Sequence, residues 1–321
     1  MLINEYIKAH HKIIRAKKIL LVAHLKPDGD AISSLCALAD LLTELKKDFT
    51  LFLKDAPPVQ YHFLPYFDQI NSDYKNLNFS SYDLIIVLDS GQLDRTGLTE
   101  EIKNREKNQY VIEIDHHPKV YDYADLEIRF PEAAATAEII YYFFKANNIK
   151  INKKIANCIL TGILTDTGNL LYENTSKETV KIASEMLIRG AKFPLILENT
   201  SRNKSLNGMK VWGKIMSNLK LNKKYNFAYA VLKYEDIEKS GASDEEMEGV
   251  AGFLSNLNGV KGLLFLRELK PGIIKGSLRT SYPGINVSKL AGYLGGGGHP
   301  RASGFTIPGK IIEDKNGWKI V

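Results

Sequence analysis

Short apolar runs separated by helical patterns dominate the first half of the 321-residue chain. The apolar runs are Lys18–Ala23, Phe49–Leu53, Leu84–Leu88 and Tyr110–Ile114. The segments with a helical spacing of apolar residues are Ala31–Leu45, Thr136–Asn147 and Asn152–Leu164. Continuous apolar strands that alternate with helices predict βαβ units, and hence a parallel sheet covered on both faces. The pattern therefore predicts a doubly wound α/β fold for this half.

Four short polar segments follow apolar segments of this half. They are HLKPDGD at 24–30, VLDSG at 87–91, IDHHP at 114–118 and TDTGN at 165–169. Right-handed crossovers place the carboxyl ends of parallel strands at one edge of the sheet, where such folds bind their ligands. His24, Asp89 and Asp115 each fall at or just after a predicted strand end. We therefore expect the segments to build one site.

Each segment on its own allows a plainer interpretation. Asp28 and Asp30 flank Gly29, as in many surface turns. Asp89 is equally well placed to cap the next segment, and Asp166 to cap a helix. IDHHP favours a site even on its own, because three titratable residues directly after a buried strand are costly unless they have partners.

Taken together, the segments supply both imidazole and carboxylate donors. The donors are His24, Asp28, Asp30, Asp89, Asp115, His116, His117 and Asp166. This mixture suits Mn²⁺, and also Fe²⁺, Co²⁺ or Zn²⁺, better than Mg²⁺ or Ca²⁺. Two such ions about 3.5–4 Å apart stabilise in-line attack on phosphorus. The segments predict hydrolysis of a phosphate ester with two divalent metal ions, for which we expect Mn²⁺. Asp115 is a candidate to orient an imidazole ring without binding a metal itself.

The second half shows a different pattern. Residues 176–222 are helix-like and rich in lysine. Beyond them we expect strands at Phe227–Leu232, Val260–Leu269 and Ile273–Arg279, helices at Asp244–Leu257 and Val287–Leu294, and a turn at the GGGGH segment, 295–299. The length favours two domains. We predict a catalytic, metal-binding domain at 1–185, a helical linker at 186–222, and a smaller α/β domain at 223–321.

Composition narrows the class further. The formal charge of +6 suits an anionic substrate, but it is too small and too dispersed to indicate binding of long nucleic acid by charge alone. Cys36 and Cys158 lie in apolar helical segments and are expected to be buried free thiols of a reducing cytoplasm. The amphipathic start lacks the apolar core of a secretory signal, and no apolar stretch reaches membrane-spanning length, so we expect a cytoplasmic protein without a membrane partner.

The four segments, together with GGGGHPRASGF near the end of the chain, resemble a DHH-type phosphoesterase with the associated C-terminal DHHA1 domain. The similarity extends over nearly the whole chain and is greatest to the group of nano-RNases that also dephosphorylate 3′-phosphoadenosine 5′-phosphate (pAp). It implies an active site in a cleft between the two domains. Arg95, in GQLDRTG, is interpreted as a salt-bridging residue rather than a substrate-binding one.

The resemblance also implies roles for individual residues. One metal would be bound by His24, Asp28 and Asp89, and the other by Asp30, Asp89, His116 and Asp166. Asp89 would bridge the ions, and His117 would contact the scissile phosphate and protonate the leaving group. Substrate would be bound by Arg279, by Gly295, Gly296, Gly297 and Gly298 through their backbone amides, and by His299. On its own, the glycine run would be only a turn.

The activity implied by the resemblance is Mn²⁺-dependent hydrolysis of short oligoribonucleotides, 2- to 5-mers, to 5′-mononucleotides, together with dephosphorylation of pAp. The partners would then be short RNA or dinucleotides and pAp. Cleavage of pApA or cyclic di-AMP is the alternative within this class. Inorganic pyrophosphatase is disfavoured by the C-terminal motif, and a non-catalytic nucleotide-binding regulator by the full set of ligands. The oligomeric state stays open, a homodimer included.

Overall fold

The computed structural model describes residues 3–243, 245–247, 249–314 and 317–321, which form two compact units, Met1–Asn203 and Lys204–Val321. The predicted mixed α/β architecture is confirmed: the first unit contains a six-stranded parallel sheet, and the second, smaller unit has a six-stranded sheet of its own. Among the described helices, none has the length and apolarity needed to cross a bilayer.

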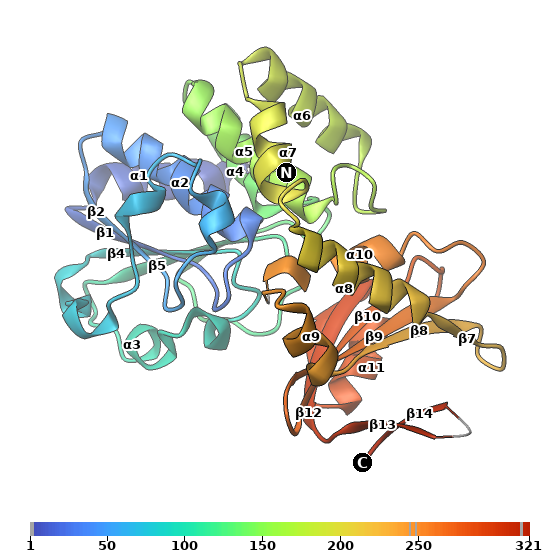
Figure 1. The fold of residues 1–321 in the computed structure, drawn as a ribbon. Coiled ribbons are helices and arrows are strands. Elements are labelled where there is room, and N and C mark those ends of the chain that lie inside the picture. Colours follow the sequence, from blue (N-terminus) through green and yellow to red (C-terminus); the bar gives the residue numbers. More distant parts are fainter. Residues whose placement is uncertain (1–2, 244, 248, 315–316) are drawn as a thin grey trace. The chain divides into compact units, whose positions relative to one another are not determined.

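The sheet of the first unit has the strand order β3-β2-β1-β4-β5-β6, with every pair parallel (Figure 1). Its strands are β1 Lys18–Val22, β2 Asp48–Phe52, β3 Ile70–Asn71, β4 Leu84–Leu88, β5 Tyr110–Asp115 and β6 Leu126–Arg129. The strand order reverses between β1 and β4, since β2 and β3 extend the sheet on one side and β5 and β6 on the other. In open α/β sheets, the crevice at such a reversal is where ligands bind.

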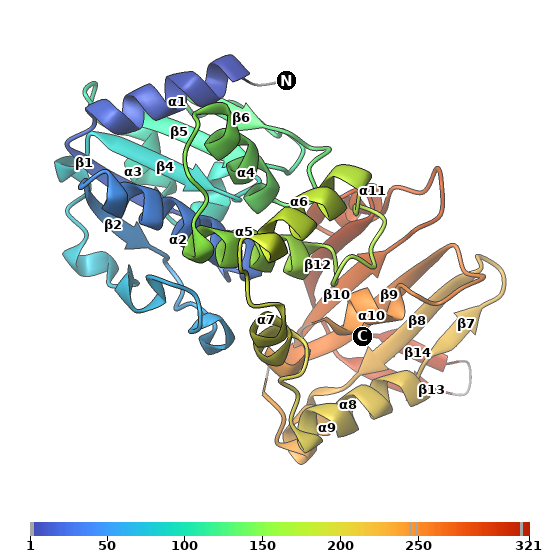
Figure 2. The ribbon, with the colours of Figure 1, turned by 90° about the horizontal axis from the view of Figure 1, so that it is seen from above.

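Apolar side chains bury both faces of this sheet. On one face, alternate residues of the strands, such as Ile19 and Leu21, pack under four helices. These helices are α1 Ile3–Arg15, α2 Gly29–Glu44, α4 Thr136–Ala146 and α5 Lys153–Asp166. On the other face, Leu20 and Val22 join a smaller cluster under α3, Thr99–Lys103. Figure 2 shows α1 beside α4, and the unit is completed by α6 Lys177–Ile188 and α7 Phe193–Thr200.

The sheet of the second unit has the order β11-β12-β10-β9-β8-β7. Its strands are β7 Lys220–Asn222, β8 Phe227–Leu232, β9 Gly262–Lys270, β10 Ile273–Arg279, β11 Gly297–His299 and β12 Ala302–Pro308. Only β8 and β9 pair in parallel among these strands. Helices α8 Leu206–Ser217, α9 Tyr234–Ser240 and α10 Val250–Leu254 pack on one face, and α11 Val287–Tyr293 packs on the other. A separate hairpin joins β13 Ile311–Asp314 to β14 Gly317–Ile320.

Two expected elements of the second unit are wrong. The helix expected at Asp244–Leu257 is instead a short 3₁₀ turn, Glu245–Met247, and the five-residue α10; Asp244 and Glu248 lie outside the described residues. Gly249 separates the two because its φ of 82° is left-handed and ends any continuous helix. The turn expected at 295–299 is shorter than predicted, because Gly297–His299 pairs with β12 as an edge strand.

Candidate active site

The predicted site lies at the carboxyl ends of β1 and β4, on either side of the strand-order reversal. His24 comes two residues after β1, and Asp89 directly follows β4. Asp89 has a left-handed backbone, with φ of 54°, and is buried. This conformation is uncommon for residues other than glycine, asparagine and aspartate, and it sets the direction in which the Asp89 side chain leaves the strand end. The first two polar segments therefore meet as the sequence predicts.

His24, Asp28 and Asp89 form a first group of donors. The Nδ1–H of His24 donates to the carbonyl of Leu25 over 2.7 Å, which leaves Nε2 as the ring's lone-pair nitrogen. This Nε2 lies 3.7 Å from Oδ2 of Asp28 and 3.7 Å from Oδ2 of Asp89. Asp28 uses its other oxygen to cap helix α2, accepting from the amides of Asp30 and Ala31 over 3.1 Å each. Asp28 can therefore form the turn at the start of α2 with one carboxylate oxygen and still offer the other oxygen as a metal ligand.

Asp30, His116 and Asp166 form a second group. His116 Nε2 lies 3.2 Å from Oδ2 of Asp166, while its Nδ1 faces the carbonyl of Ala133 at 3.3 Å. Asp166 is the last residue of helix α5, so it reaches the site from a helix end and not from a strand. The carbonyl partner again fixes the imidazole so that Nε2 is directed at the carboxylates.

Asp89 lies between the two groups. Its Oδ2 faces His24, and its Oδ1 lies 3.5 Å from His116 Nε2 and 3.5 Å from His117 Nδ1. Atoms that coordinate one ion at about 2.1 Å lie roughly 3–4 Å from each other, so the observed spacings fit transition-metal coordination. One carboxylate with an oxygen toward each group has the geometry needed to join two ions.

Helix α4 provides the hydrogen-bond donors for two of these carboxylates. The amides of Thr136 and Ala137 donate to the two oxygens of Asp30 over 2.6 and 2.9 Å, and Oγ1 of Thr136 donates to Oδ1 of Asp89 over 2.9 Å. Ala135, at the N-cap position, has no side chain to cap the helix. Asp30 therefore caps α4 from another helix, and the positive end of the α4 dipole faces the acidic site.

The carboxylates repel one another in this site. Burial, followed by the neighbouring carboxylates, raises the pKa values of Asp89 and Asp166 well above the ordinary range. Burial also raises the pKa of Asp30 to about 6, against the favourable charge of His116. Several buried carboxylates with two imidazoles are a costly arrangement for the protein alone. A bound divalent cation would relieve this cost, and the donor set fits one.

Asp115 and His117 form a pair next to the two donor groups, and His117 also belongs to a third set of metal-ligand atoms with Asp89 and His116. His117 donates from Nδ1 and from its amide to Oδ1 of Asp115 over 2.8 and 2.7 Å, and the amide of Gly91 donates to Oδ2 over 2.5 Å. Burial opposes ionisation of Asp115, but the hydrogen bond and charge of His117 lower its pKa overall. Burial lowers the pKa of His117. Asp115 thus orients the His117 ring and is directed away from the two donor groups.

Two residues of this region were missed by the sequence reasoning. Arg129, opposite Asp115 on the neighbouring strand, donates to the carbonyl of His117 and to Oε1 of Glu113, each over 2.5 Å. Thr136 is the other. The sequence signal for both is weak: Arg129 is one of many basic residues, and Thr136 only marks the start of a predicted helix.

The predicted substrate residues of the second unit are brought together by strand register. Arg279 pairs with Ala302, and Ala302 pairs with His299, so the three residues lie side by side across β10, β12 and β11. Directly opposed residues of an antiparallel pair point to the same face, so Arg279 and His299 share a face with the small side chain of Ala302 between them. His299 Nδ1 accepts from the amide of Arg301 over 3.2 Å. Gly297 and Gly298 belong to β11, while Gly295 and Gly296 precede it.

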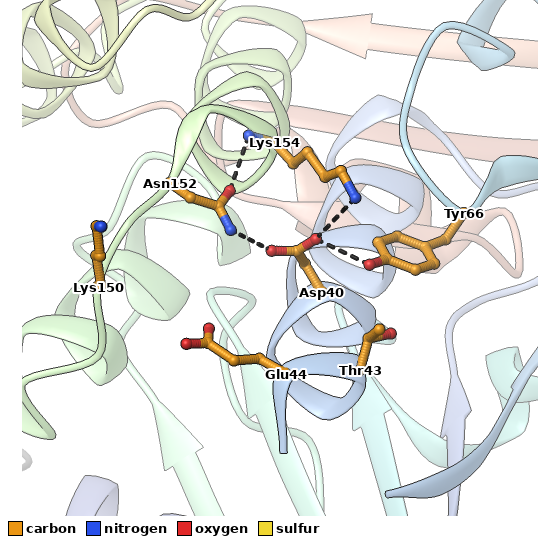
Figure 3. Close-up of a pocket in the computed structure, with 7 residues that line it drawn as sticks. All are labelled: Asp40, Thr43, Glu44, Tyr66, Lys150, Asn152 and Lys154. Atoms are coloured by element: carbon orange, nitrogen blue, oxygen red, sulfur yellow. Dashed lines mark hydrogen bonds and ion pairs between the residues drawn. The ribbon is translucent and has the colours of Figure 1, made fainter. Parts of the chain in front are cut away.

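A pocket of about 320 Å³ elsewhere in the first unit is not part of this site (Figure 3). Its central carboxylate, Asp40, accepts hydrogen bonds from Tyr66 Oη over 2.9 Å and Asn152 Nδ2 over 2.5 Å. Lys154 Nζ lies 3.7 Å from the same carboxylate. Because its oxygens are occupied by protein donors, Asp40 ties α2 to the start of α5 and to the loop of Tyr66.

The chain is similar to known proteins over most of its length. The DHH family, N-terminal domain, matches residues 18–163, and the DHHA1 domain matches residues 224–316. The bifunctional oligoribonuclease and PAP phosphatase NrnA of Bacillus subtilis is 31% identical over 90% of this chain and 89% of that protein. The protein of the same name from Thermus thermophilus is 30% identical over 92% of this chain and 86% of its own length.

Solved structures share the fold. An exopolyphosphatase-related protein from Bacteroides fragilis superposes with a TM-score of 0.86 at 29% identity, covering 94% of this chain and 91% of that one. RecJ from Thermus thermophilus, solved in complex with Mn²⁺, has a TM-score of 0.55 at 15% identity and covers 95% of this chain and 52% of that chain. The fold and the domain pair together define a phosphoesterase. This chain belongs to the DHH family with a DHHA1 domain, and it is a hydrolase that acts on phosphoester bonds.

Proposed function

We propose that this protein hydrolyses short oligoribonucleotides, 2- to 5-mers, to 5′-mononucleotides and dephosphorylates pAp. The observation that carries the proposal is the position of Asp89, with one oxygen toward each of two donor groups. The names of the two NrnA relatives, which the chain matches over most of its length, support the choice of substrates.

In this proposal, His24, Asp28 and Asp89 hold one divalent ion. Asp30, Asp89, His116 and Asp166 hold the other. Mn²⁺ is the expected metal because it accepts imidazole and carboxylate ligands together. When bound, such ions supply Lewis acidity and positive charge for in-line attack on phosphorus. The residues around them keep the ligands oriented, as Thr136 does for Asp89.

His117 is the proposed general acid. Its Nδ1 is engaged by Asp115, so Nε2 is the nitrogen left to exchange a proton with the leaving oxygen. The ring is one-quarter exposed, whereas Asp115 is fully buried. Asp115 acts by holding the tautomer and direction of the ring. Asp89, His117 and Asp115 are thus the proposed catalytic group, with Asp115 in the supporting position.

The second unit is proposed to bind the nucleotide. Arg279 and His299 lie on one face of its sheet and offer a guanidinium and an imidazole to an anionic group. The backbone amides of Gly297 and Gly298 would add neutral donors. The predicted use of the Gly295 and Gly296 amides is not supported, because these amides already donate to the carbonyls of Gly292 and Ala291 over 3.1 and 2.9 Å. A terminal nucleotide held in this way, with the adjacent phosphate hydrolysed by the first unit, would favour short strands.

A substrate panel with Mn²⁺ tests the proposal. It compares pAp, RNA 2-mers to 5-mers, a 24-mer, pApA, cyclic di-AMP and pyrophosphate, ranked by kcat/KM. We expect pAp and the short RNAs to rank first, with 5′-mononucleotides as the RNA products. A 24-mer cleaved as fast as a dinucleotide would refute the length preference. Pyrophosphate or cyclic di-AMP ranking first would replace the proposed substrates.

A further inference from the structure

Arg95, interpreted from the sequence as a salt-bridging residue, lies beside the site in the structure. The side chain is half-buried, and no hydrogen bond or ion pair of its guanidinium is found within the described parts of the chain. Two other arginines of this unit form ion pairs: Arg105 with Asp125 over 3.0 Å, and Arg189 with Glu185 over 2.7 Å. Among the described residues, the guanidinium of Arg95 therefore forms no ion pair with a carboxylate.

The backbone around Arg95 is fixed to the segment that carries His24. Arg95 belongs to a short 3₁₀ helix, Leu93–Thr96. Its carbonyl accepts a hydrogen bond from the amide of Leu25 over 2.6 Å, and its own amide donates to the carbonyl of Gln92 over 3.2 Å. The start of the side chain is thus anchored next to a metal-ligand candidate, while the guanidinium remains available.

The guanidinium lies close to His117. A Cβ atom built on Gly91 would be 3.1 Å from Nη1 of Arg95 and 3.5 Å from Cγ of His117. The two side chains thus flank one small space above Gly91. The distance between Nη1 of Arg95 and Cγ of His117 cannot exceed the sum of these two distances. Arg95 interacts electrostatically with Asp28.

The charge balance favours an anionic ligand for Arg95. The proposed metal sites contain four carboxylates: Asp28, Asp30, Asp89 and Asp166. Two dications would neutralise them, so the positive charge of Arg95 would then be in excess. A guanidinium presents paired N–H donors that match the oxygens of a phosphate.

We propose that Arg95 is a further catalytic residue, which donates hydrogen bonds to non-bridging oxygens of the substrate phosphate beside His117. This inference rests on the proposed function of the same site. In that position the guanidinium would stabilise the negative charge that develops on the phosphate during attack, which is the effect expected of a fixed donor near the reacting centre.

The test uses the full-length protein and the variants R95Q, R95K and R105Q. Calorimetry measures Mn²⁺ binding first, and then the binding of inorganic phosphate to the Mn²⁺-loaded protein. We expect R95Q to bind Mn²⁺ as the wild type does, to bind phosphate at least tenfold more weakly, and to hydrolyse pAp with kcat/KM reduced by about 10²-fold. R95K, which retains the charge but not the paired donors, should fall between R95Q and the wild type. R105Q removes the ion pair with Asp125 and a hydrogen bond to the carbonyl of Ile102, neither of which involves a residue of the site, so it should match the wild type in Mn²⁺ and phosphate binding.

The results separate this inference from the proposed function. If the wild type hydrolyses none of the nucleotides, the proposed function fails, but the phosphate titration still decides the role of Arg95. Equal phosphate binding by wild type and R95Q, or none by either, would overturn the inference. The inference would also be overturned if the R95Q substitution weakened Mn²⁺ binding by the same factor as phosphate binding. Arg95 would then act through the metal ligands and not on the phosphate. R95K settles the question if R95Q does not fold.

Discussion

Thr136 donates a hydrogen bond from Oγ1 to Oδ1 of Asp89 over 2.9 Å, and both side chains are buried. Valine has nearly the shape of threonine but no donor. Partners of a ligating group typically change metal affinity or activity by about 10–100-fold. We therefore expect T136V to weaken Mn²⁺ binding and pAp hydrolysis by at least about tenfold, and T136S to retain both. Calorimetric titration and steady-state kinetics measure the two effects.

Thr179 offers a matched control for that substitution. It is also buried, and its Oγ1 donates to Oε2 of Glu138 over 2.9 Å. Glu138 belongs to none of the donor groups found in the described residues. T179V should lower thermal stability but leave Mn²⁺ affinity unchanged. If T136V and T179V show the same Mn²⁺ affinity, Thr136 does not position Asp89.

Asp89 belongs to the first donor group and also lies 3.5 Å from His116 of the second, whereas of these two groups His116 contributes to the second only. We expect D89A to lose both metal sites and H116A to lose one. Both variants should lose turnover, because in-line attack needs both ions. The stoichiometry of Mn²⁺ binding and kcat for pAp are the measurements. Turnover at the wild-type level by either variant in Mn²⁺ would show that the two-metal assignment is incorrect.

Substitution of Asp40 should affect stability and not turnover, because its hydrogen bonds connect structural elements of the first unit. D40A leaves the hydroxyl of Tyr66 and the amide of Asn152 without their acceptor. Loss of such a buried partner costs about 1–3 kcal/mol. We expect a lower free energy of unfolding in urea and an unchanged kcat for pAp. A strong loss of kcat in the folded variant would instead indicate that the structure of this pocket is coupled to that of the candidate active site.

Gly162 allows helix α5 to approach α2 and α4 closely. A Cβ atom at this position would lie 2.5 Å from Oδ1 of Asp30 and 2.5 Å from Cβ of Ala137. We expect G162A to destabilise the fold by about 1–3 kcal/mol through overpacking and to weaken Mn²⁺ binding, because the new methyl displaces Asp30. In α8, a Cβ on Gly213 would meet no atom within 4 Å, so G213A should stabilise by about 0.5–1 kcal/mol. Unfolding curves and Mn²⁺ titrations of both variants check this contrast.

Without metal, the carboxylates make stability depend on pH. Burial, followed by the charges of Asp30 and Asp28, raises the pKa of Asp89 in the folded protein. In the unfolded chain this carboxyl ionises near pH 4. The stability that it contributes is complete below that pH and is lost as the pH rises through the folded pKa. In chelator, the Tm of the wild type should fall from about pH 5 to neutrality, and that of D89N should fall less. Parallel profiles would contradict the raised pKa.

The sequence was sufficient to predict the strands of the first unit that are continuous and apolar. Lys18–Ala23 and Leu84–Leu88 are buried on both faces, and such runs leave few alternatives. It was also sufficient for the meeting of the polar segments, because parallel strands bring their ends to one edge. Strand β6, Leu126–Arg129, was missed since its alternating charged residues lie at the edge of the sheet and do not produce an apolar run.

The contacts between distant residues could not be predicted. The amide of Thr136 donates to the carboxylate of Asp30, which lies more than a hundred positions earlier in the chain. No local sequence pattern indicates such a contact. Arg95 was misjudged for a related reason: its place beside His117 depends on the backbone bond to Leu25. The predicted helix at 244–257 failed because the apolar spacing extends across Gly249, whose backbone interrupts it.

The register of β10, β12 and β11 has a consequence for how this chain can vary between species. Arg279 and His299 share a face only because each is paired with Ala302, and a slip of one residue would turn one of them to the opposite face. Insertions between Arg279 and α11 would lengthen a loop without altering that pairing. A single insertion within β12 would separate the two side chains. Length changes tolerated in evolution should therefore accumulate in the loops and be absent from these short strands.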